Sequence, residues 1–578
     1  MPARLNAGSG DGSFSGLRPS RAGGAILVAV MTALLPVVVR AQMLPPSAEP
    51  GRLEKRFEEQ AKPQSLPEIK FPAPEQAPPP EQAGKVHFRL TGIVFEGNTV
   101  ITSEALRPLY GHLLDSDLTL LDIYKLRDAI TAKLRNDGYI LSQALVPAQT
   151  VKSGVVRISI VEGAINSIRF EGDEVADRLG LIDRYTAKIK ASQPLRAEDF
   201  ERYVMLMNDL PGLRVKTVLQ PTSGTMVGSD LVVVRERKPI DASFTIDNRG
   251  SRSSGPQQLQ QSLDFNDLIG TFDQTSLRGI VTPHVDEMRY LDLAHTEVIN
   301  SEGSAVLLGV RRSWTEPGHT LRPLQVKGVN STVRFDFSHP LIRSQSETWR
   351  ANVGFDYKNS RTNVLGTRLN EDRVRVLSLG TSYDISDALQ GSNIFTLRYS
   401  QGLDIMNPTL SGSDALTRAG GRSDFRKFTF SALRMQPLPN NFGVSLGMDS
   451  QWSPDQLLSG EEFGVGGSQY GRPFDGSEIT GDKGIAAKVE LTYTPEVDIP
   501  NVQYFQLYIF VDSGAVDNYE ADVGHHGWDA LASVGTGFRT GLTNYLTGSF
   551  EIGKPFLRYT TANNTRDIRG FFSVTARY

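Results

Sequence analysis

The chain of 578 residues contains no cysteine and only four tryptophans, and its net charge is only −4. Without cysteine there are no disulfide bonds, no thiol catalysis and no cysteine-ligated zinc or iron–sulfur sites. The small net charge gives no electrostatic basis for binding nucleic acid. Hydrophobic residues make up only 39% of the chain, which excludes a bundle of transmembrane helices. A charged fraction of 22% and an aromatic fraction of 8% are those of folded proteins and argue against disorder for most of the chain.

The chain has one long apolar run, close to its N-terminus. Residues 25–39 (AILVAVMTALLPVVV) are uncharged, follow three arginines and lead into the small-x-small sequence Val39-Arg40-Ala41. The run is shorter than the ~20 residues of a membrane-spanning helix, and its flanks are typical of a secretory signal. An internal anchor helix is the alternative interpretation. We expect residues 1–41 to be a signal peptide, and any membrane-embedded part to cross as strands, because no other segment approaches spanning length.

A proline-rich segment, residues 42–86, follows. It holds ten of the 32 prolines of the chain, a composition that favours extended polyproline geometry and cannot bury a core. The stretch 51–61 (GRLEKRFEEQA) is the exception, because it lacks proline and is rich in charged helix formers. A short helix and a solvated linker are the two interpretations of this stretch.

Residues 87–238 predict two similar α+β modules. The first has strand 87–96, helices 103–110 and 119–137, and strands 142–146 and 155–162. Thr119 and Asp122 form a partial capping box at the start of its second helix. The pattern restarts with strand 165–171, helices 174–189 and 197–208, and strands 213–219 and 231–236. Both first strands end in Phe-Glu-Gly, so we expect tandem β-α-α-β-β modules at 87–163 and 164–238; one α+β domain with the same element order is the alternative.

From Asp241 onwards the helical period disappears and strict alternation replaces it. Residues 349–358 (WRANVGFDYK) alternate apolar and polar side chains without a miss, and 395–400, 442–449 and 486–493 do the same. Turn residues cluster at 359–360, 391–393 and 439–441. Segments of about ten residues with this period are the signature of an outer-membrane β-barrel.

A soluble β-sandwich alternates too, but three features favour a barrel over residues 239–578. The repeat is too long for one sandwich, and its polar face carries charged side chains in mid-strand, as a wet lumen allows. The chain also ends on an alternating strand with Phe572, Val574, Ala576 and a terminal Tyr578, which resembles the C-terminal signal of outer-membrane barrels. At about 20 residues for each strand and its connection, this length gives roughly 16 antiparallel strands.

The sequence resembles one family in particular. Residues 138–163, with GYI, ALVPAQ and ISIVEG, are similar to the first POTRA domain of two-partner-secretion transporters, the ShlB/FhaC/HecB (TpsB) family within the BamA-like superfamily. The sequence FEGNT at 95–99 also matches the opening of a POTRA domain. The resemblance runs from about residue 50 to the C-terminus and implies a short helix, a linker, two POTRA domains and a barrel.

The resemblance also supplies a site. Residues 465–476 (VGGSQYGRPFDG) resemble the inward-folded sixth extracellular loop of the family, which usually reads V-R-G-F or V-R-G-Y followed by D-G. Arg472, Phe474, Asp475 and Gly476 match this motif, whereas Gly471 and Pro473 depart from it. Residues 510–514 (FVDSG) resemble the F-x-D-x-G strand motif, with Phe510, Asp512 and Gly514 in the matching positions. The family resemblance implies that Arg472 pairs with Asp512 inside the lumen.

No enzymatic site is expected. The glycine-rich run 464–467 lies outside any βαβ unit, so it does not predict a nucleotide site. His525-His526 lacks the spacing and the further ligands of a metal site, and there is no G-x-S-x-G nucleophile elbow. We therefore predict no catalytic residues, no metal, no cofactor and no nucleic-acid partner.

The resemblance implies a pore in the outer membrane of a Gram-negative bacterium, with its POTRA domains in the periplasm. The implied client is a large TpsA-type exoprotein, a haemolysin or an adhesin, caught through its N-terminal secretion domain, with activation of the client as an additional role. Helix 51–61 would plug the pore at rest. Outer-membrane lipid and the barrel assembly machinery during biogenesis are the other implied partners. The alternative is a BamA-like assembly factor that inserts other barrels; a receptor for ligand uptake would need about 22 strands.

Overall fold

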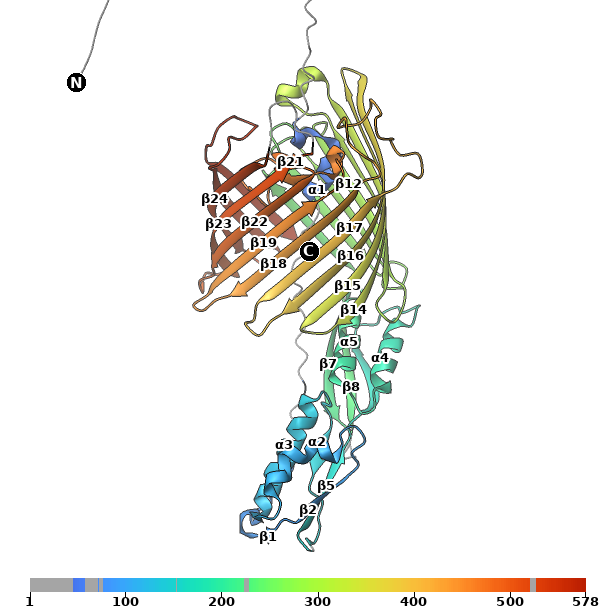
Figure 1. Ribbon diagram of the computed structural model, residues 1–578, viewed down its shortest axis with the longest axis vertical. Coiled ribbons are helices and arrows are strands. Elements are labelled where there is room, and N and C mark those ends of the chain that lie inside the picture. The colour runs from blue at the N-terminus through green and yellow to red at the C-terminus, as the bar shows by residue number, and fades with distance from the viewer. Residues whose placement is uncertain (1–44, 58–70, 72–75, 152, 223–227, 520–526) are drawn as a thin grey trace, which may run out of the picture. The chain divides into compact units, whose positions relative to one another are not determined.

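The computed structural model describes residues 45–57, 71, 76–151, 153–222, 228–519 and 527–578 (Figure 1). The expected signal peptide and the His525-His526 pair lie outside these residues. No helix within them is both long and apolar enough to cross a membrane. The described chain begins with a 3₁₀ turn, Pro46–Ala48, and helix α1, Pro50–Phe57, which lies within the predicted stretch 51–61 apart from its first residue.

The first module has a three-stranded sheet in the order β2-β5-β4. Its elements are β2 (Gly92–Glu96), α2 (Ser103–Tyr110), α3 (Leu120–Asn136), β4 (Gln143–Leu145) and β5 (Val155–Val161). The predicted strand 87–96 is wrong as a single element. It is divided at Leu90, whose side chain is fully buried, and its first part, β1 (His87–Arg89), pairs instead with β3 (Asp117–Thr119). The 3₁₀ turns Ala83–Lys85 and Gly111–Leu113 complete the module.

Helix α3 begins at a full capping box. The Thr119 hydroxyl oxygen accepts the Asp122 backbone N–H at 3.3 Å, and the Asp122 carboxylate accepts the Thr119 N–H at 3.1 Å. Hydrogen bonds from the Thr119 side chain and from Lys125 lower the pKa of Asp122 to about 2. The helix then buries its apolar stripe, which includes Ile123 and Ile130, against the sheet.

The second module repeats the plan with a sheet in the order β6-β8-β7. Its elements are β6 (Ile165–Gly172), α4 (Leu181–Ala191), α5 (Ala197–Asn208), β7 (Leu213–Pro221) and β8 (Ser229–Arg237). The predicted start of its first helix at residue 174 is wrong. Gly180 has a left-handed φ of 61°, and the Asp177 carboxylate accepts the N–H groups of Leu181 and Ile182 at 2.8 Å each. The cap therefore sets the helix start at Leu181.

The remaining chain closes into a barrel of 16 antiparallel strands, as the alternation predicted (Figure 1). The strands are β9 (Ile240–Asp247), β10 (Gln258–Asn266), β11 (Gln274–Val281), β12 (Met288–Val298), β13 (Ala305–Thr315), β14 (Lys327–Arg343), β15 (Glu347–Val364), β16 (Thr367–Ser386), β17 (Ser392–Gly402), β18 (Arg426–Pro437), β19 (Phe442–Trp452), β22 (Lys483–Tyr493), β23 (Tyr504–Asp517), β24 (Asp529–Gly541), β25 (Leu546–Pro555) and β26 (Arg569–Arg577). Closure joins β26 to β9, with Ser573–Arg577 opposite Ser243–Asp247. A 3₁₀ turn, His319–Leu324, precedes β14.

Barrel strands present alternate apolar side chains to the outside. Along β12, Leu291 and Leu293 are 42% and 47% exposed, whereas Met288 and Tyr290 are buried on the inner face. The predicted turn at 359–360 is wrong, because both residues lie inside β15 and pair with Arg373 and Asp372 of β16. The chain turns only at residues 365–366, where φ is positive at both positions, so the β15–β16 hairpin is longer than the sequence pattern indicated.

Candidate functional site

The chain between β19 and β22 folds inwards. It contains a 3₁₀ turn, Ser459–Glu461, and the small hairpin of β20 (Phe463–Val465) and β21 (Ile479–Gly481). The motif residues 471–476 form the tip of this inward loop. Phe474 is 2% exposed and packs with Val465, Ile479 and Leu531, so an apolar cluster attaches the loop to the inside of the barrel wall.

Arg472 lies at the centre of three buried carboxylates. Its Nη1 is 2.8 Å from Glu490 and 3.0 Å from Glu551, and its Nε is 3.2 Å from Asp512. The backbone N–H of Arg472 also donates to Asp512 at 3.2 Å. The guanidinium carbon lies 3.7 Å from the centre of the Phe510 ring. Because the guanidinium of Arg472 is planar, these charge-assisted hydrogen bonds fix the orientation of the loop tip as well as its position.

The other motif residues lie around this cluster. Asp475 pairs with Arg569 at 2.9 Å, and the carbonyl oxygen of Pro473 accepts a hydrogen bond from Arg569 at 2.6 Å. Gly471 has φ of 73°, and a Cβ there would lie 2.6 Å from Leu531. The glycine that departs from the family motif is therefore required by the seating of this loop. A Cβ on Gly514 would lie 2.6 Å from Val465, and one on Gly476 would lie 3.0 Å from the side chain of Arg56.

Sequence reasoning named Asp512 as the partner of Arg472 and missed Glu490 and Glu551. Both are mid-strand carboxylates on β22 and β25, and each has a second cation. Glu490 is 2.6 Å from Arg539, and Glu551 is 3.0 Å from Arg249. Glu490 was visible as a charged residue on the polar face of its strand, but its distance to Arg472 depends on the barrel register.

Helix α1 lies inside the barrel and is held by charges on its polar face. Arg52 forms an ion pair with Glu462, at the base of the inward loop, and Lys55 donates to the Glu462 carbonyl oxygen at 2.9 Å. Glu54 accepts hydrogen bonds from Asn330 at 2.6 Å and from Thr332 at 3.0 Å, both on β14. Arg52 and Glu54 are buried although they are charged, which requires this pairing.

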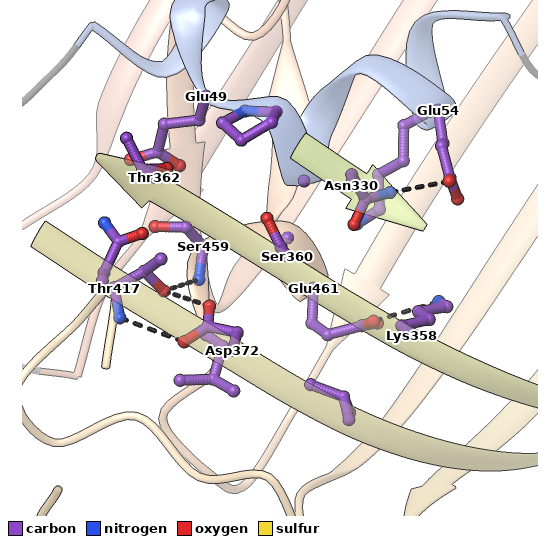
Figure 2. A pocket seen from close by; sticks show the side chains of 17 residues that line it. Glu49, Glu54, Asn330, Lys358, Ser360, Thr362, Asp372, Thr417, Ser459 and Glu461 are labelled. Carbon is purple, nitrogen blue, oxygen red and sulfur yellow. Dashed lines mark hydrogen bonds and ion pairs between the residues drawn. The ribbon is translucent and has the colours of Figure 1, made fainter. Parts of the chain in front are cut away.

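A polar pocket separates part of α1 from the barrel wall (Figure 2). It is bordered by the helix, by β14–β16 and by residues 458–461. On its floor, Glu461 contacts Lys358 at 3.0 Å and also pairs with Lys427. The neighbouring Glu462 contacts Arg418 at 3.2 Å in addition to Arg52. The base of the inward loop thus joins the helix, the wall and the β17–β18 connection in one charged network.

The second module is attached to the barrel by a further ion cluster that the sequence did not indicate. Arg343, at the end of β14, donates to both carboxylate oxygens of Asp209 at 2.7 Å each. Arg350 on β15 contacts the same carboxylate at 3.2 Å. Phe272, from the β10–β11 connection, is 1% exposed within the core of the second module. The bidentate ion pair between Arg343 and Asp209 and the inserted ring of Phe272 hold the second module, including α5, against the barrel.

A closed 16-stranded barrel with an inward loop, a helix in its lumen and two tandem α+β modules has the architecture of an outer-membrane β-barrel protein with periplasmic modules. Residues 228–540 match the family model "Haemolysin secretion/activation protein ShlB/FhaC/HecB", and residues 88–163 match the ShlB-type POTRA domain. The chain therefore belongs to the ShlB/FhaC/HecB family of two-partner-secretion transporters. It is a transporter of the outer membrane with periplasmic POTRA domains, and it is not an enzyme.

Individual relatives are similar over most of the chain. The heme/hemopexin transporter protein HuxB of Haemophilus influenzae strain KW20/Rd is 22% identical over 487 residues, which is 82% of this chain and 84% of that protein. The outer membrane transporter CdiB of Escherichia coli O6:K15:H31 is 25% identical over 492 residues, 81% of this chain and 79% of that protein. The solved structure of CdiB from Escherichia coli has a TM-score of 0.70 at 21% identity and covers 89% of this chain and 93% of that chain.

Proposed function

We propose that this transporter exports one large TpsA-type exoprotein, of the haemolysin or adhesin kind, through the lumen that α1 occupies. In this proposal α1 is a plug that leaves when the client engages, and the Arg472 cluster keeps the inward loop seated while the chain passes. Activation of the client accompanies its export. The observation that carries the proposal is the seating of α1: a short helix whose charged face is held by ion pairs and hydrogen bonds suits a wet lumen.

The POTRA domains would capture the N-terminal secretion domain of the client by strand addition. Within the part of the chain that the structure describes, strands β2 and β6 each pair along one side only, with β5 and β8 respectively. An edge strand of this kind offers backbone N–H and C=O groups to an extended partner. Such binding depends little on side chains, which favours a client that must later be released.

A disulfide across the plug tests its exit directly. A Cβ on Gly51 would lie 3.7 Å from the Cβ of Ser360 on β15, which matches the usual Cβ–Cβ distance of a disulfide, about 3.8 Å. Because the chain contains no cysteine, Gly51→Cys with Ser360→Cys introduces the only thiol pair. We expect export to stop when the pair is oxidised and to return under reducing agent. Undiminished export by the oxidised protein would refute the plug role.

A comparison of surface, medium and outer-membrane proteomes between the parent strain and a deletion strain tests the transport function and identifies the client. Loss of one large exoprotein, with other barrels unchanged, is the expected result. The activity of that exoprotein, measured after export and in periplasmic extract, tests activation. Depletion of many unrelated barrels would overturn the proposal in favour of an assembly factor of the BamA type.

A further inference from the structure

The luminal wall carries an apolar patch, although inward-facing side chains of a water-filled barrel are usually polar. Ile280 on β11 and Met288 and Tyr290 on β12 point inwards and are at most 3% exposed. Ile280 and Tyr290 are direct register partners on neighbouring strands. Because Leu291 on the same strand faces outwards, this part of β12 is apolar on both faces, and its inner face needs a cover.

Helix α1 provides that cover with two side chains. Leu53 and Phe57 form one buried cluster with the three wall residues, and the rings of Phe57 and Tyr290 lie 5.0 Å apart. Beside the patch, Arg278 of β11 donates to the backbone carbonyl oxygen of Phe57 at 2.7 Å. The wall therefore binds two apolar side chains and one backbone carbonyl, and the backbone contact is independent of sequence.

The spacing of this site fits an extended chain as well as a helix. Leu53 and Phe57 are four residues apart, which is a rise of about 6 Å along a helix. Two residues of an extended chain rise by about 6.7 Å and place both side chains on the same face. A segment with large apolar side chains at alternate positions thus presents the same pair of anchors, with its carbonyl groups accessible to Arg278.

We propose that Ile280, Met288, Tyr290 and Arg278 form a client-binding site that α1 covers at rest, and that its occupant during transport is an extended segment of the exoprotein with alternating large apolar side chains. This inference rests on the proposed function, because the client must pass the place that α1 leaves. Release of α1 uncovers the patch to luminal water, and the passing chain covers it again. The site would hold each such segment briefly and oppose backward sliding.

The test uses the full chain in planar bilayers with Arg52→Ser, Leu53→Ser, Glu54→Ser and Phe57→Ser. These changes remove the ion pair, the hydrogen bonds to β14 and both apolar anchors of α1, so that the patch is open in every sample. The probe is a short synthetic peptide of alternating threonine and phenylalanine with lysines at its ends. The comparison peptide has serine in place of phenylalanine. Heat-modifiability on gels confirms a folded barrel for each variant. We expect the phenylalanine peptide to block the current for about tenfold longer than the serine peptide, the ratio that corresponds to about 1.4 kcal/mol.

Adding Ile280→Thr and Met288→Thr should shorten the block by the phenylalanine peptide about tenfold. The matched control, Leu291→Thr with Leu293→Thr, changes the outer face of the same strand and should leave the block unchanged. Equal block times in the patch variant and the control, or equal blocks by both peptides, would overturn the inference. Failure of the proposed function would give a different result, namely an unchanged set of exoproteins in the deletion strain, so the two failures can be told apart.

Discussion

Replacing Arg472 by methionine removes a cation that forms ion pairs with three buried carboxylates. Glu490 keeps Arg539 and Glu551 keeps Arg249, so the loss falls mainly on Asp512, which is fully buried. Breaking a buried ion pair costs about 3–5 kcal/mol. We take the lower end, about 3 kcal/mol, because two of the carboxylates keep a partner, and this corresponds to roughly a hundredfold shift toward the unseated loop.

Limited proteolysis of the inward loop and current fluctuations in planar bilayers measure this shift. Arg472→Met should expose the loop to protease and increase current noise, and Arg472→Lys should have a smaller effect, because it keeps the charge and loses the planar fork. A double-mutant cycle with Asp512→Asn gives the energy of the pair itself. If the loop of Arg472→Met stays as protected as that of the parent, the carboxylate cluster does not seat it and the reasoning fails.

Three further predictions concern other parts of the molecule. Glu462→Gln removes one of the two carboxylates that pair with Arg52, the other being Glu49, and should raise the basal conductance severalfold. Conductance equal to that of the parent would show that the Glu462 ion pair is not needed to hold α1. Asp209→Ala leaves the Arg343 side chain, which is 1% exposed, without the carboxylate that it binds. Hydrogen exchange in α5 should therefore become faster by an amount equivalent to about 3 kcal/mol. Unchanged exchange would contradict the role of Asp209 in attaching the second module to the barrel. The pKa of Asp122 is about 2 in the folded chain, against a usual value of 3.8. The capping box should therefore be complete above about pH 4 and be lost as the pH falls toward 2. Amide hydrogen exchange in the first turn of α3, corrected for the intrinsic rate, should show this pH dependence in the parent and lack it in Asp122→Asn.

Local patterns explain what the sequence predicted well. Period-two alternation identified the barrel strands because each strand faces water on one side and an apolar phase on the other, and the Thr119–Asp122 box fixed the start of α3. The sequence missed contacts that depend on register. Glu490 and Glu551 are 18 and 79 positions from Arg472 in the chain, and only closure of the barrel brings them to one guanidinium.

The apolar patch under α1 could have been predicted from the sequence. Strand β12 breaks the rule that inward positions are polar, with Met288 and Tyr290 inside and Leu291 outside, and such a break marks a covered inner face. The turn wrongly expected at 359–360 is the opposite case. Asn and Ser favour turns, but pairing with β16 satisfies the backbone groups of Asn359 and Ser360. The positive φ values of this hairpin are at Leu365 and Gly366.

The length of α1 bears on how a plug of this kind would act. The eight residues of α1 that the structure describes are fewer than the ~12–15 that an isolated helix needs in water. The barrel wall, the Glu462 carboxylate and the apolar patch therefore supply the stability of this segment as a helix. A released α1 would therefore unfold, and closing the pore again would couple folding to binding, at an entropic cost for each ordered residue. A client that occupies the patch would prevent this refolding without touching α1 itself. Plug return should then be slow while a client is in transit and fast once the lumen is empty, so the pore would remain open for as long as the chain is passing.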